Sequence, residues 1–134
     1  MSAPTIETVK QSNPDWQNFV LFTEDGTNLL STTEVKPEEI TTWLGLFKDF
    51  DETIKAGLTY DGVHYHVHRF YDGLLYGRAD PNIKKTNGFC LIKSQRSAEK
   101  KPIVLLFTFD LPATTARLVP AANKYLESVK EQFQ

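Results

Sequence analysis

The sequence has little of several features that would mark a special class of protein. It contains one cysteine, Cys90, so no disulfide forms within the chain and a reducing, cytoplasmic setting is expected. No charged-then-apolar segment of the secretory kind opens it, and no apolar run approaches the roughly 20 residues that a membrane-spanning helix needs. Lys and Arg (15) do not outnumber Asp and Glu (17), which argues against a nucleic-acid partner.

Signatures of enzymes are also missing from the sequence. There is no Gly-rich phosphate loop and no Gly-x-Ser-x-Gly turn around a nucleophile. Cys90 alternates with apolar neighbours, which favours a small buried residue over a reactive thiol. The sequence therefore predicts a protein that is not an enzyme and needs no cofactor.

What is present fits an ordinary globular chain. The length of 134 residues is close to the commonest domain size, and we expect one domain over residues 1–134. Hydrophobic residues make up 40% and charged residues 24%, a composition that argues against a disordered chain and against a coiled coil.

The first half of the chain mixes helical and hairpin patterns. A short helix is predicted around residues 6–9, and two apolar runs flank Asp25-Gly26, a dipeptide typical of a tight β-hairpin. Residues 36–47 begin with proline and acids and place apolar side chains three and four residues apart, which predicts an amphipathic helix. A second short helix is predicted from residue 51 to a left-handed cap at Gly57.

From residue 58 onward the apolar pattern has a period of two. Strands are predicted at 58–60 and 63–70 around Asp61-Gly62, and further strands at 73–78, 88–94 and 102–110. The last of these is nearly all apolar at 103–109, so it should be central and covered on both faces. A C-terminal helix closes the chain. The predicted fold class is α+β, with helices on both faces of one antiparallel meander.

All three histidines fall within five residues, at His64, His66 and His68. On a regular strand they share one face, while Tyr65, Val67 and Arg69 share the other. A zinc site, a partner-binding strand and an ordinary polar face all fit this pattern. Because no second cluster of ligands exists in the sequence, we predict no dedicated metal site, although such a ladder would capture nickel or zinc weakly.

Several short segments of the sequence, taken in chain order, resemble those of the profilin family of small actin-monomer-binding proteins. They are "DGTNLLST", "KPEEIT", "GLTYDGVHYHVHR", "LLYGR", "GFCLIKS" and "PIVLLFTFD", followed by the terminal helix with Tyr-Leu. The resemblance covers almost the whole chain. It implies terminal helices on one face of the sheet, short helices on the other, and a monomeric cytoplasmic protein associated with the cytoskeleton.

The resemblance also implies an actin-binding face. Arg69 and Arg78 match family arginines, and a guanidinium suits the carboxylates of an acidic partner surface. The remaining positions that the resemblance assigns to this face are Ile54, Lys55, His64, His66, Val67, Gly88 and Arg117. Pro120 and Ala121 depart from the tyrosine and glutamate of animal profilins, and the proline predicts that the helix either begins or kinks there.

Two further family sites are less well matched. At the site for proline-rich peptides, aromatic positions of the family are occupied by Ala3 and Ile6 and by Leu29 or Leu30, which predicts weak or absent binding. Tyr125 stays aromatic, and Trp16 and Phe133 either reach the cleft or pack in the core. For phosphoinositide headgroups the candidates are Lys84, Lys85 and Lys93, with Arg96, Lys100 and Lys101 nearby.

Two functions therefore stay open. One is an actin-monomer-binding protein that sequesters or delivers monomers and so regulates polymerisation. The other is a profilin-fold adaptor with weak or no actin binding that uses its basic face for a phosphoinositide or another protein.

Overall fold

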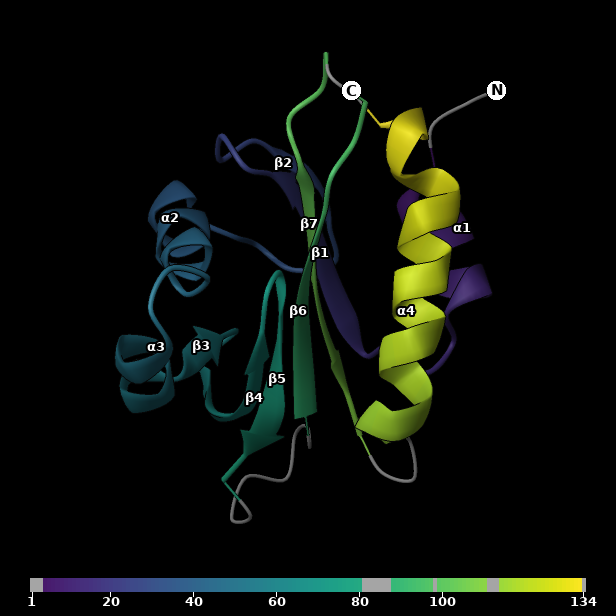
Figure 1. The fold of residues 1–134 in the computed structure, drawn as a ribbon. Helices are drawn as coiled ribbons and strands as arrows, with labels where there is room; N and C mark the ends of the chain where they lie inside the picture. Colours follow the sequence, from purple (N-terminus) through teal and green to yellow (C-terminus); the bar gives the residue numbers. More distant parts are fainter. Residues whose placement is uncertain (1–3, 81–87, 98, 111–113, 134) are drawn as a thin grey trace.

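The computed structural model describes residues 4–80, 88–97, 99–110 and 114–133. In this part of the chain one antiparallel sheet has the strand order β2-β1-β7-β6-β5-β4-β3 (Figure 1). The strands are β1 (Asn18–Thr23), β2 (Asn28–Ser31), β3 (Leu58–Tyr60), β4 (Val63–Tyr71), β5 (Leu74–Ala79), β6 (Gly88–Ser94) and β7 (Ile103–Phe109). The predicted meander is therefore confirmed, with β1 and β2 added at its far edge.

Both Asp-Gly dipeptides form the predicted hairpin turns. Gly26 has φ 95°. The Thr23 amide donates to the carbonyl of Thr27 at 2.9 Å, and this hydrogen bond closes the turn. Between β3 and β4, Asp61 and Gly62 have φ 51° and 78°. Two consecutive positive φ angles match the right-handed twist of the strands, and glycine adopts them without a steric penalty.

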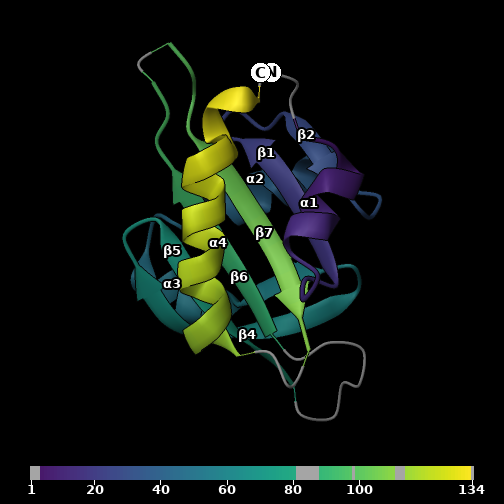
Figure 2. The same ribbon diagram turned by 90° about the vertical axis from the view of Figure 1, so that its right-hand side faces the viewer.

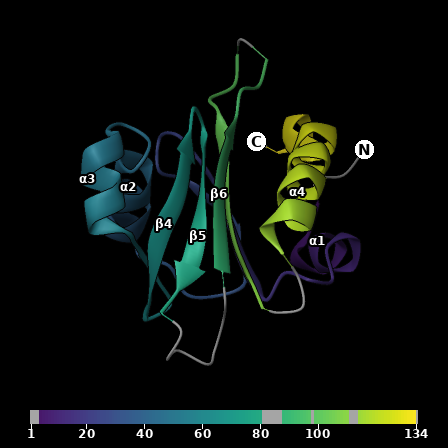
Figure 3. The ribbon, with the colours of Figure 1, turned by 60° about the horizontal axis from the view of Figure 1, so that its bottom comes forward.

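Helices cover both faces of the sheet. Helices α1 (Ile6–Ser12) and α4 (Thr115–Val129) lie on one face, and α2 (Pro37–Gly45) and α3 (Phe50–Ala56) lie on the other (Figures 1 and 3). A 3₁₀ turn, Lys130–Gln132, extends α4. The start of α2 follows from its sequence, because Pro37 suits the first helical position and Glu39 accepts a hydrogen bond from the Lys36 amide at 3.0 Å.

The sheet separates two hydrophobic clusters, and β7 contributes to both. Its seven residues are all buried: Val104 and Leu106 point to the cluster under α2, and the alternate residues point to the cluster under α1 and α4. Figure 2 shows β7 running beneath α4. The prediction of a central strand covered on both faces is confirmed. Cys90 is likewise fully buried, and burial raises the pKa of its thiol.

Of the two alternatives predicted at Pro120, a helix start and a kink, the helix start is wrong. Helix α4 begins at Thr115 and contains Pro120 in its interior. The proline has no amide to donate to the preceding turn, but Leu118, Ala122 and Leu126 on the same helix are buried against the sheet. Packing of this apolar stripe therefore decides where the helix runs.

The cap at Gly57 is also only partly as predicted. Helix α3 ends there and φ is 68°, but ψ is −164°, outside the left-handed helical region. Among the described residues, no helix is both long enough and apolar enough to cross a membrane.

Candidate functional site

A β-bulge in β4 changes which side chains share a face. Val67 pairs with Gly77 of β5, but Arg69 pairs with Tyr76, so His68 is an extra residue in β4. Beyond the bulge the alternation is reset, and Arg69 lies on the same face as Tyr76 and Arg78. The prediction that Arg69 shares a face with Tyr65 and Val67 is therefore wrong, because those two side chains are buried under α2 and α3.

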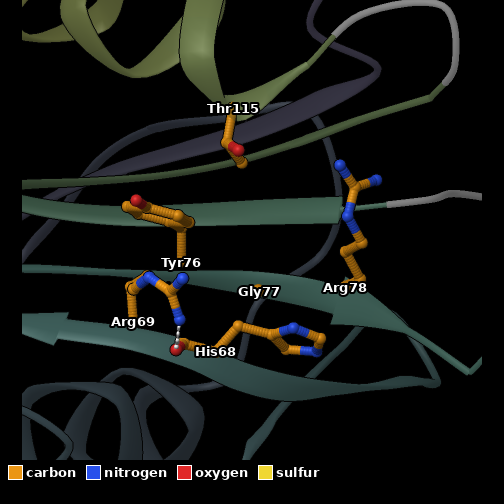
Figure 4. A pocket seen from close by; sticks show the side chains of 6 residues that line it. All are labelled: His68, Arg69, Tyr76, Gly77, Arg78 and Thr115. Atoms are coloured by element: carbon orange, nitrogen blue, oxygen red, sulfur yellow. Dashed lines mark hydrogen bonds between the residues drawn. The ribbon is translucent and has the colours of Figure 1, made fainter.

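The reset gathers basic and hydroxyl side chains in one shallow pocket of about 230 Å³. We call it the bulge pocket; it is lined by His68, Arg69, Tyr76, Gly77, Arg78 and Thr115 (Figure 4). Three different elements supply it: β4, β5 and the first residue of α4. Residues that are far apart in the sequence thus meet at the N-terminal end of α4.

The electrostatics of the bulge pocket favour an anionic partner. It contains two guanidinium groups and stands beside the N-terminus of the 15-residue helix α4, whose dipole is positive at that end. Arg69 Nη1 donates to the carbonyl of His68 at 3.0 Å, and this hydrogen bond to the bulged backbone fixes the guanidinium. Burial and a hydrogen bond with Tyr71 raise the pKa of Tyr76.

Gly77 is what allows the two strands to approach at the bulge. A Cβ atom at this position would lie 1.7 Å from the carbonyl oxygen of His66, far inside van der Waals contact. The position therefore admits no side chain while β4 keeps its path.

The exposed histidines lie on the neighbouring part of β4. The rings of His64 and His66 are perpendicular with centroids 5.4 Å apart, and His64 Nδ1 is 3.2 Å from Thr59 Oγ1. His66 pairs with Arg78 across the ladder. In the described part of the chain, no group of three or more His, Cys, Asp or Glu side chains is arranged to hold a metal ion.

The other predicted actin-face residues divide into exposed and buried sets. Ile54 is 39% exposed and Lys55 is also exposed, both at the end of α3. Val67 is 6% exposed and points into the core, and Gly88 is buried opposite Arg78 at the start of β6. Neither of these two residues lines the bulge pocket.

In α4, the predicted residues lie beyond the pocket. Arg117 is held by an ion pair with Asp15 at 2.9 Å, while Pro120 and Ala121 are exposed. Sequence reasoning missed Tyr76, Gly77 and Thr115 of the bulge pocket. The period-two pattern of β5 was a usable signal for Tyr76, since it lies two residues before Arg78 on the same face.

At the predicted peptide site most apolar side chains are partly or fully buried. Ile6, Leu29 and Tyr125 are half-buried against the cluster under α1 and α4, and burial raises the pKa of Tyr125. Phe133 is 4% exposed. Trp16 is 8% exposed and stacks on Phe107 with ring centroids 4.5 Å apart. Ala3 lies outside the described residues.

The basic residues of β6 and of the β6–β7 connection bind parts of this chain. Lys93 pairs with Glu24 at 3.0 Å, and Arg96 Nη1 donates to the carbonyls of Lys130 and Phe133 at 3.3 and 3.1 Å. Lys100 Nζ donates to the carbonyls of Glu131 and Phe133 at 2.6 and 2.8 Å. Lys84 and Lys85 lie outside the described residues.

Comparisons with known proteins agree with the fold and the sequence pattern. The profilin family model matches residues 8–130. Profilin-1 of Caenorhabditis elegans is 29% identical over 91 residues, which are 68% of this chain and 61% of that relative, so less than two thirds of the relative's length is matched.

Solved structures of low identity share the fold. Acanthamoeba castellanii profilin II has a TM-score of 0.72 at 17% identity, with 95% of this chain and 94% of that one covered. Acanthamoeba castellanii profilin IB has a TM-score of 0.69 at 20% identity, covering 89% and 88%. Schizosaccharomyces pombe profilin has a TM-score of 0.65 at 18% identity, covering 92% and 94%.

Proposed function

This chain belongs to the profilin family, and from that premise we propose that it binds monomeric actin and regulates polymerisation by sequestering or delivering monomers. The family consists of non-enzymatic actin-binding proteins. The observation that carries the proposal is the bulge in β4. It turns Arg69 to the same face as Arg78, beside the N-terminal end of α4. Two guanidinium groups held there suit carboxylates of an acidic partner surface.

The proposed interface is centred on the bulge pocket and extends over neighbouring exposed residues. His64 and His66 continue it along β4, and Ile54 and Lys55 add the end of α3. No covalent step is involved: the complex forms by surface complementarity, with charge steering the encounter.

The direct test is sedimentation velocity of this protein with latrunculin-blocked monomeric actin. We expect a one-to-one complex at micromolar concentration. Arg69→Glu and Arg78→Glu should each weaken it by at least about tenfold, or 1.4 kcal/mol, because each places a carboxylate against an acidic surface.

Lys10→Glu is the matched control. It reverses the charge at an exposed position of α1 that does not line the bulge pocket, and it should leave the affinity unchanged. Wild-type affinity in both arginine variants would remove the site assignment, and the absence of any complex would remove the actin proposal.

A profilin-fold adaptor is the second candidate function. Pro120 and Ala121 favour it, since they are exposed on α4 where animal profilins carry a tyrosine and a glutamate. Headgroup binding by Lys93 is less well supported, because this lysine is paired with Glu24. Binding of proline-rich peptides is proposed to be weak, with Tyr125 as the aromatic contact.

A further inference from the structure

The histidines of the chain form an exposed row along β4, inside the interface proposed above. We call His64, His66 and His68 the histidine row. Their side chains are exposed, whereas the residues that alternate with them from 63 to 67 are buried. The bulge keeps His68 exposed and adds Arg69 to the same pocket. Imidazole is the side chain whose charge ordinarily changes between about pH 5 and pH 8, so the charge of this surface depends on pH.

Two members of the histidine row stand beside permanent positive charges. His66 pairs with Arg78 of β5 across the ladder, and His68 lines the bulge pocket together with Arg69 and Arg78 (Figure 4). Tyr76 adds a phenol to the pocket, and no carboxylate is among the described residues that line it. Because arginine stays charged throughout this pH range, each proton that His66 or His68 takes up enlarges a cationic patch.

His64 has a different environment at the other end of the row. Its ring lies against the end of α3, since a Cβ atom added to Gly57 would be 2.8 Å from His64 Nε2, and His64 Nδ1 is 3.2 Å from Thr59 Oγ1. Its charged neighbours are Lys55, in the last turn of α3, and Asp80, which follows the end of β5 opposite His64 in the continued register. An acid of this chain thus already stands opposite His64, and an acidic partner should change its protonation less than that of His66 and His68.

We propose that the histidine row makes the actin complex pH-sensitive, so that this protein binds monomeric actin more tightly as the pH falls from about 8 to about 6. The inference rests on the proposed function, because it concerns the same interface. Carboxylates on the partner stabilise the charged imidazoles of His66 and His68, so the complex holds more protons than the two separate proteins. By linkage, adding protons then strengthens binding.

Sedimentation velocity with latrunculin-blocked monomeric actin, at about pH 8 and about pH 6, tests the proposal. We expect the wild type to bind about fivefold or more tightly at the lower pH, since several exposed charge pairs form together. The affinity of the triple variant His64→Gln/His66→Gln/His68→Gln should differ by less than about twofold between the two conditions. All three side chains are exposed, so the core is unchanged. Titration of actin itself affects both proteins equally, and the difference between them belongs to the histidine row.

Two further variants separate charge from shape. His66→Lys/His68→Lys carries fixed charges and should bind at about pH 8 as tightly as the wild type does at about pH 6. His64→Gln should keep most of the pH dependence. Equal pH dependence in the wild type and the triple variant, or no gain from the two lysines at the higher pH, would overturn the inference while actin binding stands. No complex at either pH would remove the proposed function, and the inference with it.

Discussion

At the scale of single residues, Gly77 is the position on which the candidate site depends most. A methyl group there would stand 1.7 Å from the carbonyl oxygen of His66, so Gly77→Ala must displace β4 or break the ladder. We expect a loss of about 3 kcal/mol of unfolding free energy, at the upper end of the usual cost of overpacking. Urea denaturation followed by circular dichroism measures this loss.

Gly45→Ala is the matched control for this substitution. Gly45 ends α2, and no heavy atom lies within 4 Å of an added Cβ. Alanine there should be neutral or stabilising by up to about 1 kcal/mol, since it favours the helix. If Gly77→Ala were as stable as Gly45→Ala, the close approach of β4 and β5 would not be a constraint on the fold.

The residue scale is also where sequence reasoning failed. The alternation from His64 to Val67 follows the predicted faces, and burial confirms it. One extra residue, His68, then reverses the faces beyond it. A bulge is defined by pairing with another strand, and nothing in the local composition of β4 reveals that register, so the exchange of Arg69 between faces was not predictable.

At the scale of elements, local signals succeeded where one short-range effect dominates. The two Asp-Gly turns and the start of α2 at Pro37 were predictable because each depends on allowed φ angles or on one cap. Pro120 shows the opposite case. The local rule makes this proline either a helix start or a kink, but α4 already runs from Thr115, with Leu118 buried ahead of the proline.

The C-terminal end of α4 and the 3₁₀ turn that follows it carry two glutamates whose ionised form the fold stabilises. Hydrogen bonds from Lys130 and Ser94 lower the pKa of Glu127, and those from the amide and hydroxyl of Ser97 lower the pKa of Glu131. A lowered pKa in the folded chain means that the folded chain binds fewer protons here than the unfolded chain. The stabilisation is therefore complete well above the ordinary carboxyl pKa of 4.5 and is lost as the pH falls through the folded-state values.

The double variant Glu127→Gln/Glu131→Gln tests this linkage. At pH 7 it should melt below the wild type, and the difference in Tm should shrink as the pH falls below about 4.5, where the wild-type carboxyls also become neutral. Thermal unfolding from pH 7 to pH 2.5 follows both proteins. A Tm difference that is constant over this range would show that the charges of these two groups do not stabilise the end of α4.

At the scale of the whole molecule, the sheet both divides the core and joins its halves. Trp16 belongs to the cluster under α1 and α4, and Trp43 to the cluster under α2. The strands β1 and β7 send alternate buried side chains into both clusters, so neither half keeps its packing if the other melts. This supports the interpretation of the chain as one cooperative domain.

Single-tryptophan variants turn that argument into a measurement. In Trp16→Phe the remaining indole reports on the cluster under α2, and in Trp43→Phe it reports on the cluster under α1 and α4. Both variants should be less stable than the wild type, because each loses buried ring area. Within each variant, however, the urea midpoint from tryptophan fluorescence should equal the midpoint from circular dichroism, since the strands shared by the two clusters must unfold once. A fluorescence midpoint that differs from the circular dichroism midpoint in either variant would mean that one face of the sheet can lose its helices while the other stays folded.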